Sequence, residues 1–303
     1  CDVVVEPKDD AYTVFSQTMD RTGYALGTLA VKSGLRAPVP AIDKLEWLSM
    51  EDMMGDMSNM AGMDHGAMNM GGMSMDNMDM SGMSSMEGDS MAQMPNMAGM
   101  DHSAMGMQHG GMAMDHSKHA ANADPLKTPS KKPRHASTEY GASTDNRIDS
   151  PRTTLNDPGV GLRNNGRRVL TLADMHTIGG PLDPRGPGRE IELHLTGNME
   201  RYTWSFDGLE FGKSSPVHFK YGERVRVILQ NDTMMTHPMH LHGVWSELET
   251  PEGEFLARRH TIPVQPAQRI SFLVTADALG RWAWHCHLMM HMDAGMFREV
   301  IIA

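Results

Sequence analysis

The chain has 303 residues, a formal net charge of -11 and a hydrophobic fraction of 40%. Its length allows about two domains of ordinary size, and no apolar run reaches the ~20 residues that a membrane-spanning helix needs. The acidic balance argues against a nucleic-acid partner, because proteins that bind nucleic acid present basic surfaces. The only cysteines are Cys1 and Cys286, so no disulfide framework is implied.

Residues 1–37 carry short strand patterns. Residues 1–5, 11–17 and 27–31 are rich in β-forming residues and are separated by polar turns. We interpret residues 1–37 as the last strands of a preceding β domain, because this length cannot bury a core by itself. The chain also starts without an initiator methionine or a signal-peptide pattern. We therefore expect it to be part of a larger protein.

Between Met50 and Met114 the chain is methionine mixed with Gly, Asp, Ser, Asn and Ala, and residues 59–68 return at 96–105 with one substitution. A helical core stripe is one interpretation, but the intervening residues prefer turns. A sacrificial sink for oxidants is another, because methionine oxidises reversibly. We favour Cu(I) binding, since thioethers are soft ligands. The segment is expected to be disordered when empty.

A second linker, from about residue 115 to 155, mixes prolines and serines with Lys127, Lys131, Lys132 and Arg134. A short basic run can contact nucleic acid, but this one has no aromatic residues and belongs to an acidic chain. We interpret it as a solvated spacer. Residues 38–154 are thus predicted to be a Met/His-rich insert followed by a Pro/Lys linker.

Residues 155–303 are predicted to be a folded all-β domain. Alternating patterns at residues 190–195, 202–206, 224–229 and 269–274 indicate half-buried strands. Turn signals such as Asp207-Gly208 and Gly222-Glu223 separate them, as in a Greek-key β-sandwich. No helical period of similar length is present. A last strand is expected at residues 297–302, after a loop.

Two segments concentrate metal-ligating side chains. Residues 237–243 read HPMHLHG, and residues 285–296 read HCHLMMHMDAGM. Two imidazoles, a thiolate and a weak axial thioether make an electron-transfer copper site, and the candidates are His237, Cys286, His291 and Met296. Successive strand residues face opposite sides, so His285 and His287 must point away from that copper. They would face a second metal centre, with His240 and His242.

These residues have two other interpretations. Histidines can be satisfied core residues, and Cys with His can form a structural zinc site. Zinc sites close at four ligands, whereas this constellation offers twice that number. Copper therefore explains the spacing better.

The two segments resemble the last two copper-binding motifs of multicopper oxidases, in the final cupredoxin domain of that family. The flanking residues 155–163 and 281–284, with the methionine-rich insert, are similar to its periplasmic copper-resistance (CopA-type) branch. The resemblance implies a cupredoxin-like fold and copper of types 1, 2 and 3. It assigns His237, Cys286, His291 and Met296 to type 1 copper, His240 to type 2 copper, and His242, His285 and His287 to type 3 copper.

Half of the trinuclear ligands of this family lie in two His-x-His motifs of an N-terminal cupredoxin domain, and outside the two segments described above this chain has no further His-x-His motif. The histidines outside the insert and the two segments are isolated, and we interpret each as a surface or sheet residue; they are His135, His176, His194, His218 and His260. We therefore expect a C-terminal fragment. Residues 1–37 would be the end of a preceding cupredoxin domain.

The leading hypothesis is an oxidase that takes electrons from Cu(I) or an organic reductant and reduces O₂ to water. Its partners would be copper ions, O₂ and the missing N-terminal domain. The residues Met234, Met235, Met289, Met290 and Met292 either pass Cu(I) inward or pack. The alternatives are a periplasmic copper-sequestration protein acting through the insert, and a one-copper carrier, against which His285 and His287 argue. Methionine in place of cysteine favours the oxidising periplasm.

Overall fold

The structure, a computed structural model, describes residues 5–56 and 126–303. The predictions for residues 1–4 and for most of the methionine-rich insert lie outside the described residues. Near the N-terminus, β1 (Ala11–Gln17) and β2 (Tyr24–Ala30) pair as an antiparallel hairpin. A single helical turn, α1 (Met50–Met54), follows, and the backbone N–H of Asp52 donates to the Ser49 side chain that caps it.

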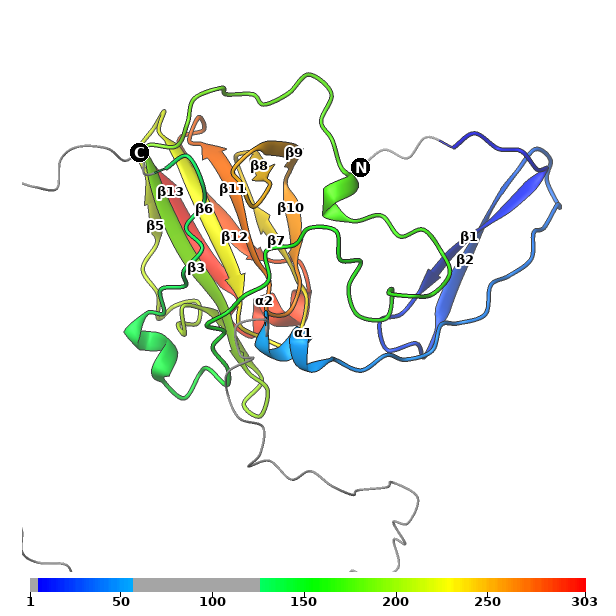
Figure 1. The fold of residues 1–303 in the computed structure, drawn as a ribbon, viewed down its shortest axis with the longest axis horizontal. Helices are drawn as coiled ribbons and strands as arrows, with labels where there is room; N and C mark the ends of the chain where they lie inside the picture. The colour runs from blue at the N-terminus through cyan, green and yellow to red at the C-terminus, as the bar shows by residue number, and fades with distance from the viewer. Residues whose placement is uncertain (1–4, 57–125) are drawn as a thin grey trace, which may run out of the picture. The chain divides into compact units, whose positions relative to one another are not determined.

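The remaining strands form two sheets (Figure 1). One has the order β10-β7-β12-β13-β5, and the other has the order β4-β3-β6-β11-β8-β9. Consecutive strands mostly belong to different sheets, which is the connectivity of a Greek-key sandwich. The bounds are β3 (Arg189–Asn198), β4 (Thr203–Phe206), β5 (Val217–Phe219), β6 (Arg224–Asn231), β7 (His237–Leu241), β8 (Ser246–Glu249), β9 (Phe255–Arg259), β10 (Thr261–Val264), β11 (Arg269–Thr275), β12 (Gly280–Cys286) and β13 (Phe297–Ile302), with α2 (Met289–Asp293) and the 3-10 turns η4 (Ser137–Tyr140) and η5 (Leu172–Asp174).

Side chains from both sheets share one hydrophobic core. The six-stranded sheet contributes Leu195 and Val227, and the five-stranded sheet contributes Leu241, Trp284 and Val300. All five are at most 2% exposed. The fold is therefore the all-β, cupredoxin-like sandwich that the sequence predicts.

Each predicted strand of this domain coincides with an observed one, although the run at 202–206 begins one residue before β4. Residues 190–195, 202–206, 224–229 and 269–274 correspond to β3, β4, β6 and β11, and the last strand, β13, has the predicted bounds. The segment between β12 and β13 is not only a loop, because it contains the single turn α2. The alternating pattern carries no signal for one helical turn, which is too short to show a period.

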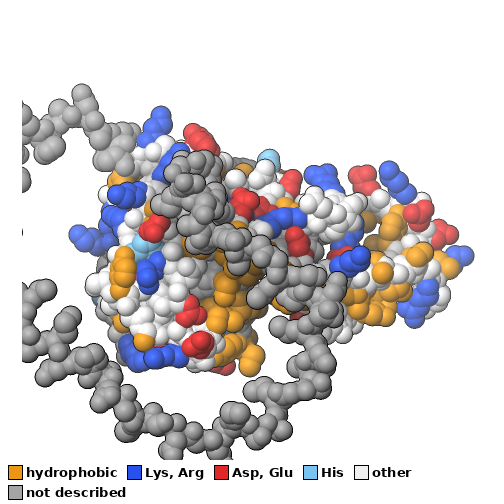
Figure 2. Space-filling view, turned by 60° about the horizontal axis from the view of Figure 1, so that its bottom comes forward, with side chains coloured by type: hydrophobic (Ala, Val, Ile, Leu, Met, Phe, Trp, Pro, Cys, Tyr) orange, Lys and Arg blue, Asp and Glu red, His pale blue; other side chains and the backbone are white. Residues whose placement is uncertain are grey.

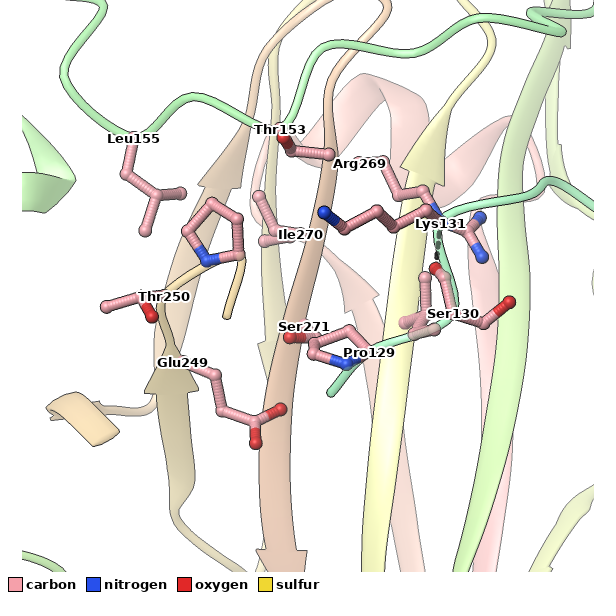
Figure 3. A pocket seen from close by; sticks show the side chains of 12 residues that line it. Pro129, Ser130, Lys131, Thr153, Leu155, Glu249, Thr250, Arg269, Ile270 and Ser271 are labelled. Atoms are coloured by element: carbon pink, nitrogen blue, oxygen red, sulfur yellow. Dashed lines mark hydrogen bonds between the residues drawn. The ribbon is translucent and has the colours of Figure 1, made fainter. Parts of the chain in front are cut away.

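The outer face of the six-stranded sheet is more buried than the half-buried strands that the sequence predicts. Strand β6 is buried along its whole length, because residues 126–150 lie against this face. Arg226 Nη1 donates to the Leu126 carbonyl at 2.7 Å, and Arg269 Nε donates to the Ser130 carbonyl at 3.0 Å (Figure 3). The remaining space, lined by Pro129 and Ile270 among others, is only about 20 Å³. That is room for one water molecule. The prediction of a solvated spacer is wrong for these residues.

Buried ion pairs explain why this face needs a cover. Arg226 pairs with Glu249 at 2.8 Å, and Arg269 pairs with Glu192 at 2.8 Å. A buried ion pair is favourable only when further hydrogen bonds satisfy the remaining protons and lone pairs. The backbone carbonyls of the linker supply these acceptors.

The surface drawn in Figure 2 carries Lys and Arg side chains interspersed with Asp and Glu. Neither sign dominates this face. Within residues 5–56 and 126–303, none of the helices combines the length and the apolar character required to cross a bilayer.

Candidate metal centre

Strands β7 and β12 bring the two histidine-rich segments side by side. They pair antiparallel, with His285 opposite His240 and Cys286 opposite Met239. Along β7, His237 and Met239 are buried whereas Pro238 and His240 are half-exposed. This is the alternation of a strand with one face on the core. It places one ligand set inside the sandwich and a second set on the outside.

The inner set is a compact group of three ligating atoms. Cys286 Sγ lies 3.6 Å from His237 Nδ1 and 3.8 Å from His291 Nδ1, and the two nitrogens are 3.1 Å apart. All three residues are buried. The turn α2 returns His291 to the sulfur, since the N–H of His291 donates to the Leu288 carbonyl at 3.0 Å. Two nitrogens and one sulfur therefore face a common point.

Met296 lies at the same end of the sandwich. Its side chain is 0% exposed within the core, and its carbonyl accepts the N–H of Cys286 at 3.1 Å. This bond fixes the backbone of Met296 beside that of Cys286. Sequence reasoning named all four of these residues, and the structure places Met296 next to the compact group of three.

A hydrogen-bond chain fixes the tautomer of His237. The amide nitrogen of Asn231 donates to two carbonyls, those of Met235 and Val264, so its oxygen is free to accept the Thr233 hydroxyl proton at 2.8 Å. The Thr233 oxygen then accepts from His237 Nε2 at 2.7 Å. This arrangement leaves Nδ1 of His237 unprotonated and facing the sulfur. Orienting contacts of this kind are typical of metal-ligating histidines.

Burial sets the protonation of the inner set. It raises the pKa of the Cys286 thiol to about 11. It also lowers the pKa of His291, and it holds the pKa of His237 well below its ordinary value, with added repulsion from His291. Neutral imidazoles are the form that binds metal, whereas a thiolate in this place needs a positive charge next to it. The donor set therefore fits a soft metal ion such as copper.

The outer set consists of His240, His242, His285 and His287. Ring centroids of His240 and His242 are 4.3 Å apart, and those of His285 and His287 are 6.0 Å apart. Nε2 of His242 lies 3.0 Å from Nε2 of His285, a contact that needs a proton or a metal ion between two lone pairs. Burial, and then His240, lower the pKa of His242. The four imidazoles thus form an array that could bind metal ions.

This outer array is more open than the inner set. His287 is exposed, and His240 and His242 are half-exposed. Within the described residues, the compact groups of potential metal ligands are the inner set and one other group, which contains none of these four histidines. The outer array is therefore less compact than the inner set.

Sequence reasoning missed the residues that support the ligands. Trp204 is fully buried and stacks on His291, with centroids 4.1 Å apart. Thr233 holds His237, and the His260 carbonyl accepts from His240 Nδ1 at 2.5 Å. The pattern gave no signal for Trp204 and His260, since both come from other strands or turns. Thr233 lies four residues before His237 but looks like an ordinary loop residue.

The comparisons with known proteins cover the same part of the chain. The family model described as multicopper oxidase matches residues 184–303. This region is therefore similar to the multicopper oxidases. Copper is the metal of this family, and both ligand sets of the structure lie inside the matched region.

Relatives extend the similarity to nearly the whole chain. It is 53% identical to copper resistance protein A of Escherichia coli over 301 residues, which is 99% of this chain and 47% of that protein. It is 55% identical to copper resistance protein A of Pseudomonas syringae pv. tomato, over 99% of this chain and 47% of that protein. The chain thus spans about half the length of these curated relatives.

A solved multicopper oxidase from Campylobacter jejuni, described as a metallo-oxidase, has 22% identity and a TM-score of 0.36, covering 40% of this chain and 31% of that one.

Proposed function

We propose that the chain is the C-terminal part of a copper-resistance multicopper oxidase, which oxidises Cu(I) or an organic reductant and reduces O₂ to water. In this proposal His237, Cys286, His291 and Met296 hold type 1 copper. His240 holds type 2 copper, and His242, His285 and His287 hold type 3 copper. The observation that carries the proposal is that one strand, β12, contributes to both ligand sets through neighbouring residues.

Copper would supply a one-electron couple at the inner set. The residues then provide the route between the sets. Cys286 ligates through its sulfur, and its carbonyl accepts from His285 Nδ1 at 2.9 Å. An electron at the sulfur is therefore one short backbone segment and one hydrogen bond from an outer imidazole. A plain electron carrier has no use for such a route.

The outer array would hold the copper ions at which O₂ is reduced only when its set of ligands is complete. Reduction of one O₂ to two waters takes four electrons and four protons, and each Cu(I) oxidised to Cu(II) delivers one electron. We propose that an N-terminal cupredoxin domain of the full-length protein supplies the remaining imidazoles. The half-length match to the copper resistance proteins supports this expectation.

A cavity near the inner set suits the electron donor. It has a volume of about 630 Å³, and its lining includes Pro238, Leu288, Met175, Met234 and Met235. Pro238 directly follows His237 of the inner set. Leu288 directly precedes α2, which carries His291. Thioethers are soft donors for Cu(I), and an apolar lining also accommodates an organic reductant.

The methionines near the ligands do not share one environment. Met234, Met289 and Met290 are 40%, 54% and 71% exposed, whereas Met235 is partly buried against the core. The exposed three contribute little packing, which favours a role in passing Cu(I) inward. Met235 serves as a packing residue as well.

The test is to load the purified chain with copper, to oxidise the bound copper to Cu(II) with ferricyanide, and then to record the visible spectrum and the copper-to-protein ratio. We expect an intense thiolate-to-copper band that vanishes in Cys286→Ser. The matched control adds Ser246→Cys on β8 to the Cys286→Ser variant. This places a thiol elsewhere in the sandwich, and it should not return the band. Absence of the band in the oxidised parent chain, with copper still bound, would overturn the type 1 assignment.

The second candidate is a copper-sequestration protein, which the methionine content of the insert favours: the chain has 32 methionines. Deleting residues 57–114 separates the two functions. An oxidase keeps its blue copper and loses only loosely held ions, whereas a storage protein loses most of its copper. We place either activity in the periplasm, where thioethers outlast free thiols.

A further inference from the structure

A second compact group of ligating side chains lies at the outer face of the six-stranded sheet. It consists of His135, Glu139, His194 and Asp232, whose ligating atoms all lie within 4.8 Å of one another. His135 and Glu139 come from the linker at η4, His194 lies on β3, and Asp232 follows β6. Three of the four are buried, and the His135 side chain is only 7% exposed. None of them belongs to the copper ligands discussed above.

The distances suit four ligands around one ion. Nδ1 of His194 lies 2.7 Å from Asp232 Oδ2 and 3.4 Å from Glu139 Oε2. Nδ1 of His135 lies 2.7 Å from Glu139 Oε2 and 3.6 Å from Asp232 Oδ2. Tetrahedral bonds of 2.0–2.1 Å to nitrogen and oxygen separate neighbouring ligand atoms by about 3.3 Å. The two short contacts would open by about half an ångström around a metal.

The far side of each imidazole ring faces a carboxylate. Nε2 of His194 lies 3.0 Å from Glu192 Oε1, and Nε2 of His135 lies 3.5 Å from Asp149 Oδ1. Both rings thus turn Nδ1 to the centre and Nε2 to an acid outside it. A carboxylate behind a ligating histidine fixes its tautomer and orientation. The arrangement is complete for His194, whereas Nε2 of His135 makes no hydrogen bond and has only the exposed Asp149 carboxylate near it.

Charge also favours a cation at the centre. The side chains of Glu139 and Asp232 are 0% exposed, and two buried carboxylates need compensating positive charge. Among the ion pairs of residues 5–56 and 126–303, none joins either carboxylate to Lys or Arg. A divalent ion would balance them. Two protonated imidazoles would do so as well, and this metal-free network is the alternative that the experiment must exclude.

We propose that His135, Glu139, His194 and Asp232 bind one divalent transition-metal ion of the zinc class. Two nitrogens and two oxygens close a four-coordinate shell, so the site is structural and has no open position for a substrate. The ion would fasten the linker at η4 to β3 and to the end of β6. Asp232 is followed by Thr233, which orients His237, so the same ion would steady the support of the inner set.

The experiment counts zinc in the 303-residue chain without copper, because Cu²⁺ outcompetes Zn²⁺ at most sites of this kind. The background carries Cys286→Ser and His285→Gln, which disable both copper ligand sets. In this background His194→Gln and His135→Gln should each bind one Zn²⁺ fewer per chain after gel filtration. The matched control is His218→Gln, an exposed histidine on β5, which should retain the full zinc content.

A second readout is the zinc-induced rise in Tm, since an ion that binds only the folded state stabilises it. The rise should be smaller in His194→Gln than in His218→Gln. Equal zinc contents and equal rises in these two variants, both folded by circular dichroism, would overturn the proposal and leave an ion-pair network.

If the histidine variants do not fold, X-ray absorption at the zinc edge of the background protein decides. We expect nitrogen and oxygen neighbours at about 2.0–2.1 Å, and a lower zinc content in Glu139→Gln. A zinc content that Glu139→Gln leaves unchanged would refute the assignment.

Discussion

The inner and outer ligand sets share strand β12 but differ in almost every other respect. The inner residues Cys286 and His291 are buried, and this chain alone supplies a compact group. The outer residues His240 and His242 are half-exposed and form an open array. A strand turns successive side chains to opposite faces. The neighbouring residues Cys286 and His285 of β12 therefore contribute to the buried inner set and to the more open outer array, respectively. The residues proposed for electron entry thus form a compact group within this chain, whereas the second set is more open.

Removing one histidine from each set gives the largest expected contrast. His291→Gln should abolish the intense blue band of the copper-loaded chain, because it removes one of three strong ligands from a buried site. His242→Gln should leave the band in place, because this residue faces the other side of β7. Visible absorption at equal copper loading measures both. A band lost in His242→Gln would break the distinction between the sets.

Removing one tryptophan beside each ligand set tests whether the two sets also differ in how much their surroundings stabilise the fold. Trp204→Ala should lower the free energy of unfolding by about 3–5 kcal/mol, the usual cost of deleting a buried tryptophan. Trp204 is 0% exposed and stacks on His291. The control is Trp245→Ala, because Trp245 is 48% exposed near the outer array. Its expected effect is below about 1 kcal/mol.

Urea unfolding of the metal-free variants checks this expectation. Similar losses for the two tryptophans would mean that the inner side is no better packed than the outer side.

Acid also lowers the stability of the fold that carries both ligand sets, and Asp52 accounts for part of this pH dependence. Burial alone would raise the pKa of Asp52, but hydrogen bonds from Arg163 and Ser49 lower it to about 2. A depressed carboxyl pKa stabilises the fold above the unfolded value of about 3.9, and this stabilisation is lost as the pH falls toward 2. The shift corresponds to about 2 kcal/mol at neutral pH.

Asp52→Asn removes this contribution. Its free energy of unfolding should be about 2 kcal/mol lower at pH 7 and should depend less on pH between 4 and 2. Urea unfolding at several pH values measures both, with Asp10→Asn as the control, since Asp10 is an exposed aspartate just before β1. An unchanged pH slope in Asp52→Asn would exclude this carboxyl as a source of acid sensitivity.

The sequence predicted the elements that depend on local pattern, and missed those that depend on distant contacts. A period of two gave β3, β6 and β13, and the spacing within two short segments placed the ligands on opposite faces. The cover on β6 was missed because its partners, such as Leu126 and Arg226, are 100 residues apart. His135 and His194 looked isolated for the same reason, since chain folding brings their rings to 4.7 Å.

Thr233 offers the finest test of the inner set, because it supports a ligand without touching the metal. Valine has nearly the same shape, so Thr233→Val removes the acceptor of His237 Nε2 and frees this ring to change its tautomer. Loss of such an orienting contact lowers metal affinity by about 10–100-fold. The blue band should therefore persist at full copper loading but require more copper to saturate.

Competition with a Cu(I) chelator measures the affinity, and the outer array provides the control. Thr261→Val removes a hydroxyl that lies 3.3 Å from His240 Nδ1 on the outer side. It should leave the affinity of the blue site unchanged. If both variants weaken the blue site equally, general loosening of the sandwich rather than the tautomer of His237 explains the loss. A weaker site in Thr233→Val alone means that the inner set depends on a hydrogen bond that sequence pattern does not reveal.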